Sequence, residues 1–251
     1  MNELATASIV FVILFGATLL GMRLRAALPE HHLAPDAKDA VKVGMGSVAT
    51  MAALVLGLLV ASTKSAYDTE RNEVIQMAAK IDYLDGVLAN YGPEAKACRE
   101  MLRGAVERAI IRMWPGQDTQ HAQLDPAVSW TDALPNAIYK LAPESDVQRA
   151  LKSQAVQLIN ELGQMRWLLY EQEESSISIP LLVVVVSWLA VMFISVGLYA
   201  PPNLTVIVAL MLAAMSVAGA IFLILELDMP FDGILRISSA PMRNALEHLA
   251  Q

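Results

Sequence analysis

Four long apolar runs constrain this chain more than any other feature of its sequence. A helix needs roughly 20 apolar residues to cross the hydrocarbon core of a bilayer. Backbone polar groups in lipid must pair within the segment, so such runs cross a membrane as helices. We therefore predict an all-α polytopic membrane protein whose four transmembrane helices are Ala5–Met22, Val43–Thr63, Ile177–Tyr199 and Leu204–Leu225.

The first run is predicted to remain in the protein as a helix. A cleaved signal peptide has a basic n-region and a small-residue cleavage site. Here Glu3 is the only charged side chain before the run, and Arg23 and Arg25 follow it. We therefore expect Ala5–Met22 to be a transmembrane helix and not a leader.

The composition of the chain excludes several other classes of protein. Its 251 residues are 55% hydrophobic and only 17% charged, whereas a soluble domain has about 25% charged residues. The net charge of −7 argues against a nucleic-acid partner, because such partners select for basic surfaces. A single cysteine leaves no internal disulfide and no Cys-based zinc site.

The runs divide the chain into four segments. Residues 1–63 would form a first transmembrane pair, 64–176 an extramembrane helical domain, 177–228 a second transmembrane hairpin, and 229–251 a C-terminal tail. The turn Ala200-Pro201-Pro202-Asn203 is short enough to pack the last two spans antiparallel.

The extramembrane domain is predicted to be built on extensions of the second and third transmembrane helices. No proline interrupts Lys64–Tyr91, and apolar positions recur there every three or four residues, which is typical of a coiled-coil seam. The same spacing precedes the third span and runs into it as far as Pro180. Two such helices, one leaving the membrane and one returning, should pack as an antiparallel stalk. The predicted seam positions are Tyr67, Glu70, Val74, Met77, Ile81, Leu84, Leu88 and Tyr91, and then Val147, Leu151, Ala155, Leu158, Leu162, Met165, Leu169 and Gln172.

The orientation follows from the distribution of basic residues. The loop between the first two runs carries Arg23, Arg25, Lys38 and Lys42, whereas the N-terminal stub carries no Lys or Arg. By the positive-inside rule we expect this loop to be cytoplasmic, in an inner (plasma) membrane. Both termini and the helical domain would then lie outside.

Sequence motifs for chemistry are lacking. The chain has no nucleophile elbow, Walker loop, HExxH, Rossmann glycine pattern or CxxC. The pair His31-His32 lies in a short loop beside Glu30 and Asp36. Adjacent His side chains diverge in most backbones and no third or fourth ligand is fixed nearby, so a solvated loop is the favoured interpretation. Cys98 shares a helix stripe with Leu102 and Ala105 and is interpreted as a small buried hydrophobe. We expect no enzyme activity, no cofactor and no metal site.

The second span carries a stripe of small and weakly polar side chains. Two explanations are open: close helix packing, or a pore wall in which an apolar ring gates by dewetting. Packing is the commoner one, and the small residues of the fourth span favour it more clearly; they are Ala209, Ala213, Ser216 and Ala220. The candidate pore-lining residues are Ser47, Thr50, Leu54, Gly57 and Ala61.

Glu226 and Asp228 end the fourth span beside Pro230. Carboxylates at a membrane edge can bind ions or form the mouth of a pathway. They can equally be hydrated at the headgroups or pair with Lys64, and this structural interpretation is the favoured one.

Several segments together resemble one family over nearly the whole chain. They are Lys38-Asp39-Ala40-Val41-Lys42-Val43-Gly44, Ala53-Leu54-Val55-Leu56-Gly57-Leu58-Leu59-Val60, the helix positions Tyr67, Arg71, Val74 and Ala78, and Leu227-Asp228-Met229-Pro230-Phe231-Asp232-Gly233 with Ile237-Ser238-Ser239 and Pro241. The chain resembles the bestrophin-like domain-of-unknown-function family of bacteria and plants.

This resemblance implies two helical hairpins in the membrane with a helical extramembrane domain. By analogy with bestrophins, which are pentameric anion channels, it also implies a channel. Bestrophins keep their helical domain in the cytosol, opposite to the orientation that the basic residues predict. We retain the orientation that rests on this sequence.

The leading hypothesis is a homo-oligomeric ion channel, conducting anions and lined by the second span. Ser47 and Thr50 would donate hydrogen bonds to a partly dehydrated ion, and Leu54 would form the constriction. The partners are other copies of the chain and the lipid bilayer. The alternative is a non-conducting scaffold or sensor whose helical stalk binds a protein partner. A secondary transporter is disfavoured, because the spans show neither broken helices nor an inverted repeat.

Overall fold

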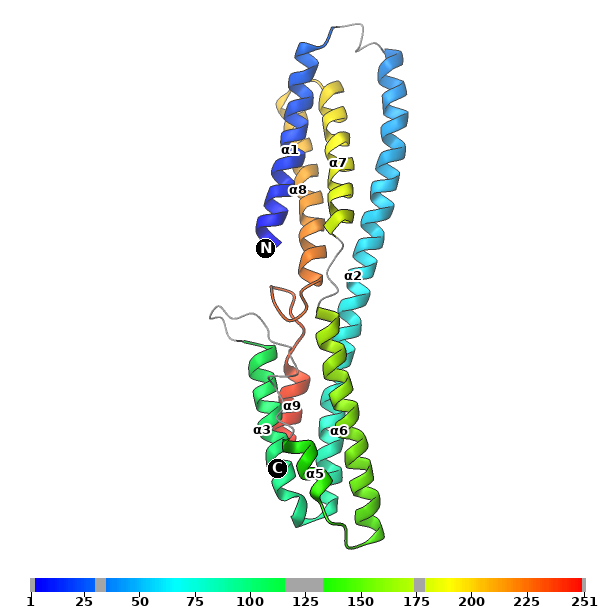
Figure 1. The fold of residues 1–251 in the computed structure, drawn as a ribbon. Helices are drawn as coiled ribbons and strands as arrows, with labels where there is room; N and C mark the ends of the chain where they lie inside the picture. Colours follow the sequence, from blue (N-terminus) through cyan, green and yellow to red (C-terminus); the bar gives the residue numbers. More distant parts are fainter. Residues whose placement is uncertain (1–2, 30–34, 116–132, 174–178, 250–251) are drawn as a thin grey trace. The chain divides into compact units, whose positions relative to one another are not determined.

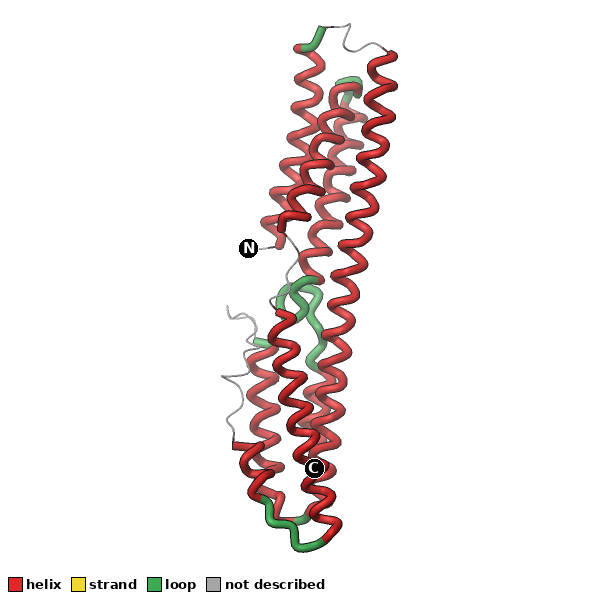
Figure 2. The backbone as a smooth tube through the Cα atoms, turned by 45° about the vertical axis from the view of Figure 1, so that its right-hand side comes forward, coloured by secondary structure: helices red, strands yellow, loops and turns green. Residues whose placement is uncertain are grey.

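The fold is all-α, as predicted. The computed structural model describes residues 3–29, 35–115, 133–173 and 179–249, which contain eight α-helices, a 3₁₀ turn and no strand (Figures 1 and 2). Four of these helices are long and apolar enough to cross a membrane. The pair His31-His32 and residues 116–132 lie outside the described residues.

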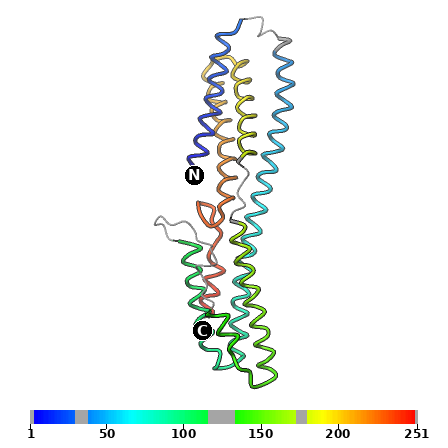
Figure 3. The backbone as a smooth tube through the Cα atoms, in the orientation of Figure 1, coloured from blue at the N-terminus to red at the C-terminus, as the bar shows by residue number. Residues whose placement is uncertain are grey.

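The chain forms two compact units, which we call the membrane unit (residues 1–65 and 177–228) and the extramembrane unit (residues 66–176 and 229–251). One helix, α2 (Pro35–Tyr91), contributes to both units (Figure 3). The predicted extension of the second span is therefore confirmed. The predicted continuity of the third span with the stalk concerns residues 174–178, which lie outside the described part of the chain.

The membrane unit contains α1 (Glu3–Ala27), the first part of α2, α7 (Ile179–Tyr199) and α8 (Leu204–Leu227). The α7–α8 turn ends at Asn203, whose side-chain oxygen accepts a hydrogen bond from the Val206 amide at 2.9 Å and caps α8. Arg25 donates to the Ala200 carbonyl at 2.6 Å and ties the end of α1 to this turn.

Two glycines let α1 and α7 approach closely. A Cβ atom at Gly21 would lie 2.2 Å from the Ile194 carbonyl oxygen, and one at Gly197 would lie 2.3 Å from the Thr18 carbonyl oxygen. Any side chain at either position would collide with the backbone of the facing helix. Small residues thus serve intramolecular packing at this contact.

The extramembrane unit contains the antiparallel stalk. Its second helix is α6 (Asp146–Glu173). Gln148 donates to the Tyr91 carbonyl at 3.1 Å, Lys80 pairs with Glu161, and Gln172 donates to Glu73 at 3.2 Å. Residue numbers rise along α6 as they fall along α2, so the two helices run in opposite directions.

Most predicted seam positions are buried in one apolar cluster. On α2 every seam position from Glu70 to Tyr91 is buried, and Tyr67 packs against the cluster. On α6 the prediction is wrong only at Val147, which is 68% exposed. The contact of Gln148 with Tyr91 places this first turn of α6 at the end of α2, so α2 offers Val147 little surface to pack against.

Smaller helices complete this unit. They are the 3₁₀ turn Pro93–Ala95, α3 (Lys96–Met113), α5 (Ala133–Lys140) and α9 (Ala240–His248). Arg99 of α3 pairs through two 2.7 Å hydrogen bonds with Asp85 of α2, and these bonds raise the pKa of the Arg99 guanidinium. Cys98 is buried, as expected, and burial raises the pKa of its thiol.

The helix α9 was not predicted, because residues 229–251 were assigned only as a tail. Its single apolar stripe buries Met242 and Ala245, and its first turn contains Pro241. A helix of this length offers too few periodic positions to be recognised without its packing partners.

The contact at Gly21 gives a direct test of the membrane unit. Gly21→Ala should lower the free energy of unfolding in detergent by about 1–3 kcal/mol, since the added methyl group overpacks the α1–α7 contact. Gly16→Ala on the same helix is the matched control, because a Cβ there meets no atom within 4 Å. Equal stability of the two variants would contradict the close approach of α1 and α7.

Candidate pore-facing surface

The five candidate pore-lining residues lie on one face of α2 that the described part of the chain leaves exposed. All five are exposed, and Leu54 is 64% exposed. We call this surface the small-residue face; it consists of Ser47, Thr50, Leu54, Gly57 and Ala61. Val43 is 74% exposed and precedes Ser47 by one helical turn, so the same spacing extends this face toward the start of the span.

The opposite face of α2 holds the helix in the membrane unit. Ala52, Leu59 and Thr63 are buried there, in or beside the apolar core formed with α1, α7 and α8. The Thr63 hydroxyl donates to the Leu59 carbonyl at 3.0 Å, which satisfies it without a partner helix. Only 11% of the apolar stretch of α2 that could cross the membrane is buried, compared with 22% to 28% of the corresponding stretches in the other described spans. The chain therefore covers α2 less than any other described span.

The surroundings of Gly57 show whether close packing within one chain explains the small residues of this face. A Cβ atom at Gly57 would meet nothing within 4 Å, in contrast to Gly21 and Gly197. Close packing inside the chain therefore gives no reason for a glycine at this position. The small-residue face must instead border lipid, water or another copy of the chain.

One hydroxyl group of this face is hydrogen-bonded within α2. Thr50 donates its hydroxyl proton to the Gly46 carbonyl of its own helix at 3.0 Å. This is the usual way in which a helical threonine satisfies its donor. In this rotamer the hydroxyl proton of Thr50 is donated within its own helix.

Large apolar side chains border the small-residue face. Met51 and Leu58 lie on one side of it and are 51% and 69% exposed, and Val60 on the other side is 42% exposed. An exposed apolar border of this kind fits a lipid or a neighbouring transmembrane helix.

Glu226 and Asp228 lie in less accessible places. Glu226 is 3% exposed near the end of α8, and Asp228 caps the C-terminus of this helix and is half-buried. Neither is brought together with the small-residue face by a described contact. Both stay candidates for ion binding or for a pore mouth.

Small residues of α8 lie on both its exposed and its buried sides. Ala209, Ala213 and Ser216 are exposed, whereas Ala214 and Ala218 form the buried side of the helix. The first three are therefore largely unpacked within the described part of one chain, Ala220 is half-buried, and packing of this stripe against another copy stays a prediction. The sequence does not show which side of α8 is buried, because almost every position of this helix is apolar.

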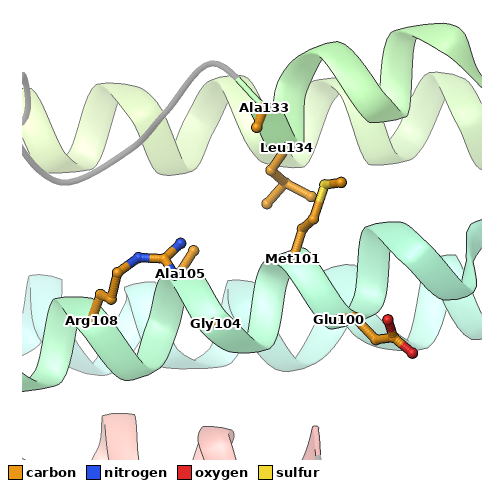
Figure 4. A pocket seen from close by; sticks show the side chains of 7 residues that line it. All are labelled: Glu100, Met101, Gly104, Ala105, Arg108, Ala133 and Leu134. Atoms are coloured by element: carbon orange, nitrogen blue, oxygen red, sulfur yellow. The ribbon is translucent and has the colours of Figure 1, made fainter.

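The extramembrane unit has a small cavity of about 150 Å³ between α3 and α5 (Figure 4). Glu100 and Arg108 lie at opposite ends of the row of α3 side chains that lines it. Met101 and Leu134 lie between them and are apolar. Within the described residues no group of three His, Cys, Asp or Glu side chains could hold a metal ion.

A family model for the bestrophin-like domain matches residues 12–242. The chain belongs to the bestrophin-like family. The match includes all four candidate spans in whole or in part, the stalk, and every candidate site residue. Membership of the bestrophin-like family suggests a membrane protein of channel-like type. No curated protein and no solved structure matches the chain.

Proposed function

We propose that this protein is a homo-oligomeric membrane ion channel whose pore is lined by the small-residue face of α2. The exposure of this face carries the proposal. It lies in a candidate transmembrane helix, it contains hydroxyl groups and a glycine, and the described chain does not cover it. Glycine and serine side chains offer lipid little apolar surface to contact. In a narrow water-filled path they leave space for water, and serine can form hydrogen bonds with it.

Several copies are needed to enclose such a path. One chain offers four candidate spans, and the small-residue face of its α2 forms only one wall. Copies related by a closed rotational symmetry would place this face around a central axis. The flanking Leu58, Met51 and Val60 would then be covered by neighbouring subunits.

The side chains of the face favour an anion. The span Val43–Thr63 contains no Asp or Glu, so it lacks the carboxylate ring that often selects cations. Ser47 would donate to a partly dehydrated anion, as would Thr50 after a rotamer change. Leu54 would form an apolar constriction that closes by dewetting. Membership of the bestrophin-like family supports the same assignment.

A second function is favoured by the continuity of α2. This helix extends from the membrane unit into the stalk without interruption, which suits a scaffold or sensor that transmits a signal mechanically. Exposed Trp167 and Leu168 on α6, 53% and 48% exposed, would be the contact surface for its protein partner.

Ion flux measurements separate the two functions. In protein reconstituted into vesicles, an anion gradient should drive flux, and Leu54→Ser should raise it several-fold by hydrating the constriction. Leu212→Ser on α8 is the matched control, because Leu212 is also half exposed but lies outside the small-residue face. This control should leave the flux unchanged.

Two results would count against conduction through α2. One is the absence of flux in both the unaltered protein and Leu54→Ser. The other is an equal rise for Leu54→Ser and Leu212→Ser, which would indicate a general leak.

We propose further that the loop 23–42 is cytoplasmic and the extramembrane unit lies outside, in the plasma membrane. The charge pattern of this loop supports the orientation. The native thiol is a poor reporter of it, because Cys98 is buried and its thiol has a raised pKa, so little reactive thiolate forms.

Orientation is best tested with introduced cysteines in a Cys98→Ala background. Glu107→Cys on α3 and Ala26→Cys at the end of α1 replace exposed residues. In intact cells an impermeant thiol reagent should label Glu107→Cys and leave Ala26→Cys unlabelled until the membrane is permeabilised. The reverse pattern would place the extramembrane unit in the cytosol.

A further inference from the structure

The segment that follows α8 is a folded loop, which we call the α8–α9 loop (Met229–Ser239). The Asp232 amide donates to the Met229 carbonyl at 3.2 Å, and the Ile237 amide donates to the Pro230 carbonyl at 2.7 Å. Gly233 lies at the tip with a φ of 76°, a conformation that suits glycine. These bonds give the loop a defined inner and outer side.

The inner side is part of the core of the extramembrane unit. Phe231 and Ile237 are 4% and 2% exposed. The ring of Trp114 meets Phe231 edge to face at a centroid distance of 5.8 Å, and its indole nitrogen donates to the Ile237 carbonyl at 2.7 Å. The loop is therefore held at both ends of its tip.

The outer side is also apolar and is partly exposed. Ile234 is 74% exposed, Met229 is 41% exposed and Leu235 is 39% exposed. Arg236 follows directly and is exposed as well. A loop fixed by its inner residues thus presents a cluster of large apolar side chains and one cation outward.

The position of the loop in the chain limits what can cover this cluster. Met229 directly follows Asp228, the cap of α8, which is a candidate membrane span. The bond from Ile237 back to Pro230 closes the loop two residues after that cap. Even a fully extended chain would reach only about 20 Å over the six residues from Asp228 to Ile234. The tip is therefore held within reach of the headgroup region.

We propose that the tip of the α8–α9 loop binds the bilayer surface, with Ile234 and Leu235 inserted at the boundary between headgroups and acyl chains. Apolar side chains bind this boundary in proportion to the area that they bury. Arg236 can extend its charged end to a lipid phosphate while its stem stays in the apolar layer. The bilayer is favoured over a protein partner because α8, a candidate membrane span, ends directly before the loop. The exposed charge beside the tip, Arg236, complements phosphate, whereas Asp232 on the other side of the tip is half-buried. This anchor operates whether or not the protein conducts ions.

The proposal can be tested with a polarity-sensitive fluorophore attached to Ile234→Cys in a Cys98→Ala background. The full chain is reconstituted into vesicles of phosphatidylcholine and phosphatidylglycerol, with and without brominated acyl chains. We expect blue-shifted emission that brominated lipid quenches strongly. The matched control is Asn244→Cys, an exposed position of α9 outside the loop, whose label should emit as in water and resist quenching.

Two results would overturn the proposal. Emission from Ile234→Cys that matches the Asn244→Cys control would mean that the tip lies in water. Blue-shifted emission that brominated lipid does not quench would mean that protein, such as a second copy of the chain, covers the tip. Leu235→Cys repeats the measurement at the neighbouring position, so that poor labelling or folding of one variant does not decide the outcome.

Discussion

The packing of α2 in the membrane unit determines which of its side chains the chain exposes. One side of the helix, with Ala52 and Leu59, is buried against α1, α7 and α8. This burial fixes the rotation of α2 about its axis and so directs Ser47, Leu54 and Gly57 outward. Since the packed side is as apolar as the exposed one, packing sets this rotation, and no contrast between polar and apolar faces is needed.

The surroundings of the glycines distinguish the exposed face of α2 from the contact between α1 and α7. Gly21 and Gly197 are required by the backbone contact between α1 and α7, whereas a side chain at Gly57 would meet no described atom. Backbone contact within the chain therefore explains Gly21 and Gly197 but does not explain Gly57. An outward glycine beside hydroxyl groups fits an arrangement of subunits around a narrow aqueous path, and this fit is the basis of the channel proposal.

The sequence predicted helices well where burial of one side repeats apolar residues every three or four positions. The seam from Glu70 to Tyr91 could be identified because a water-exposed helix shows a contrast between apolar and polar positions. That contrast is missing inside a bilayer, so the sequence did not indicate that Ala214 and Ala218 form the buried side of α8. The helix α9 and the inner side of the α8–α9 loop were missed because their packing partners, including Trp114, lie far away in the sequence. The small-residue face was identified from its spacing, and its lack of cover within the chain became visible only in three dimensions.

The most direct measurement is the structure of the assembled protein in a lipid nanodisc, with the radius along its symmetry axis. Our account predicts that α2 of every subunit surrounds the axis, with Ser47 and Gly57 facing an open path that narrows at Leu54. A structure in which the face is wedged against neighbouring helices, or points into the bilayer, would contradict it and leave only the membrane architecture.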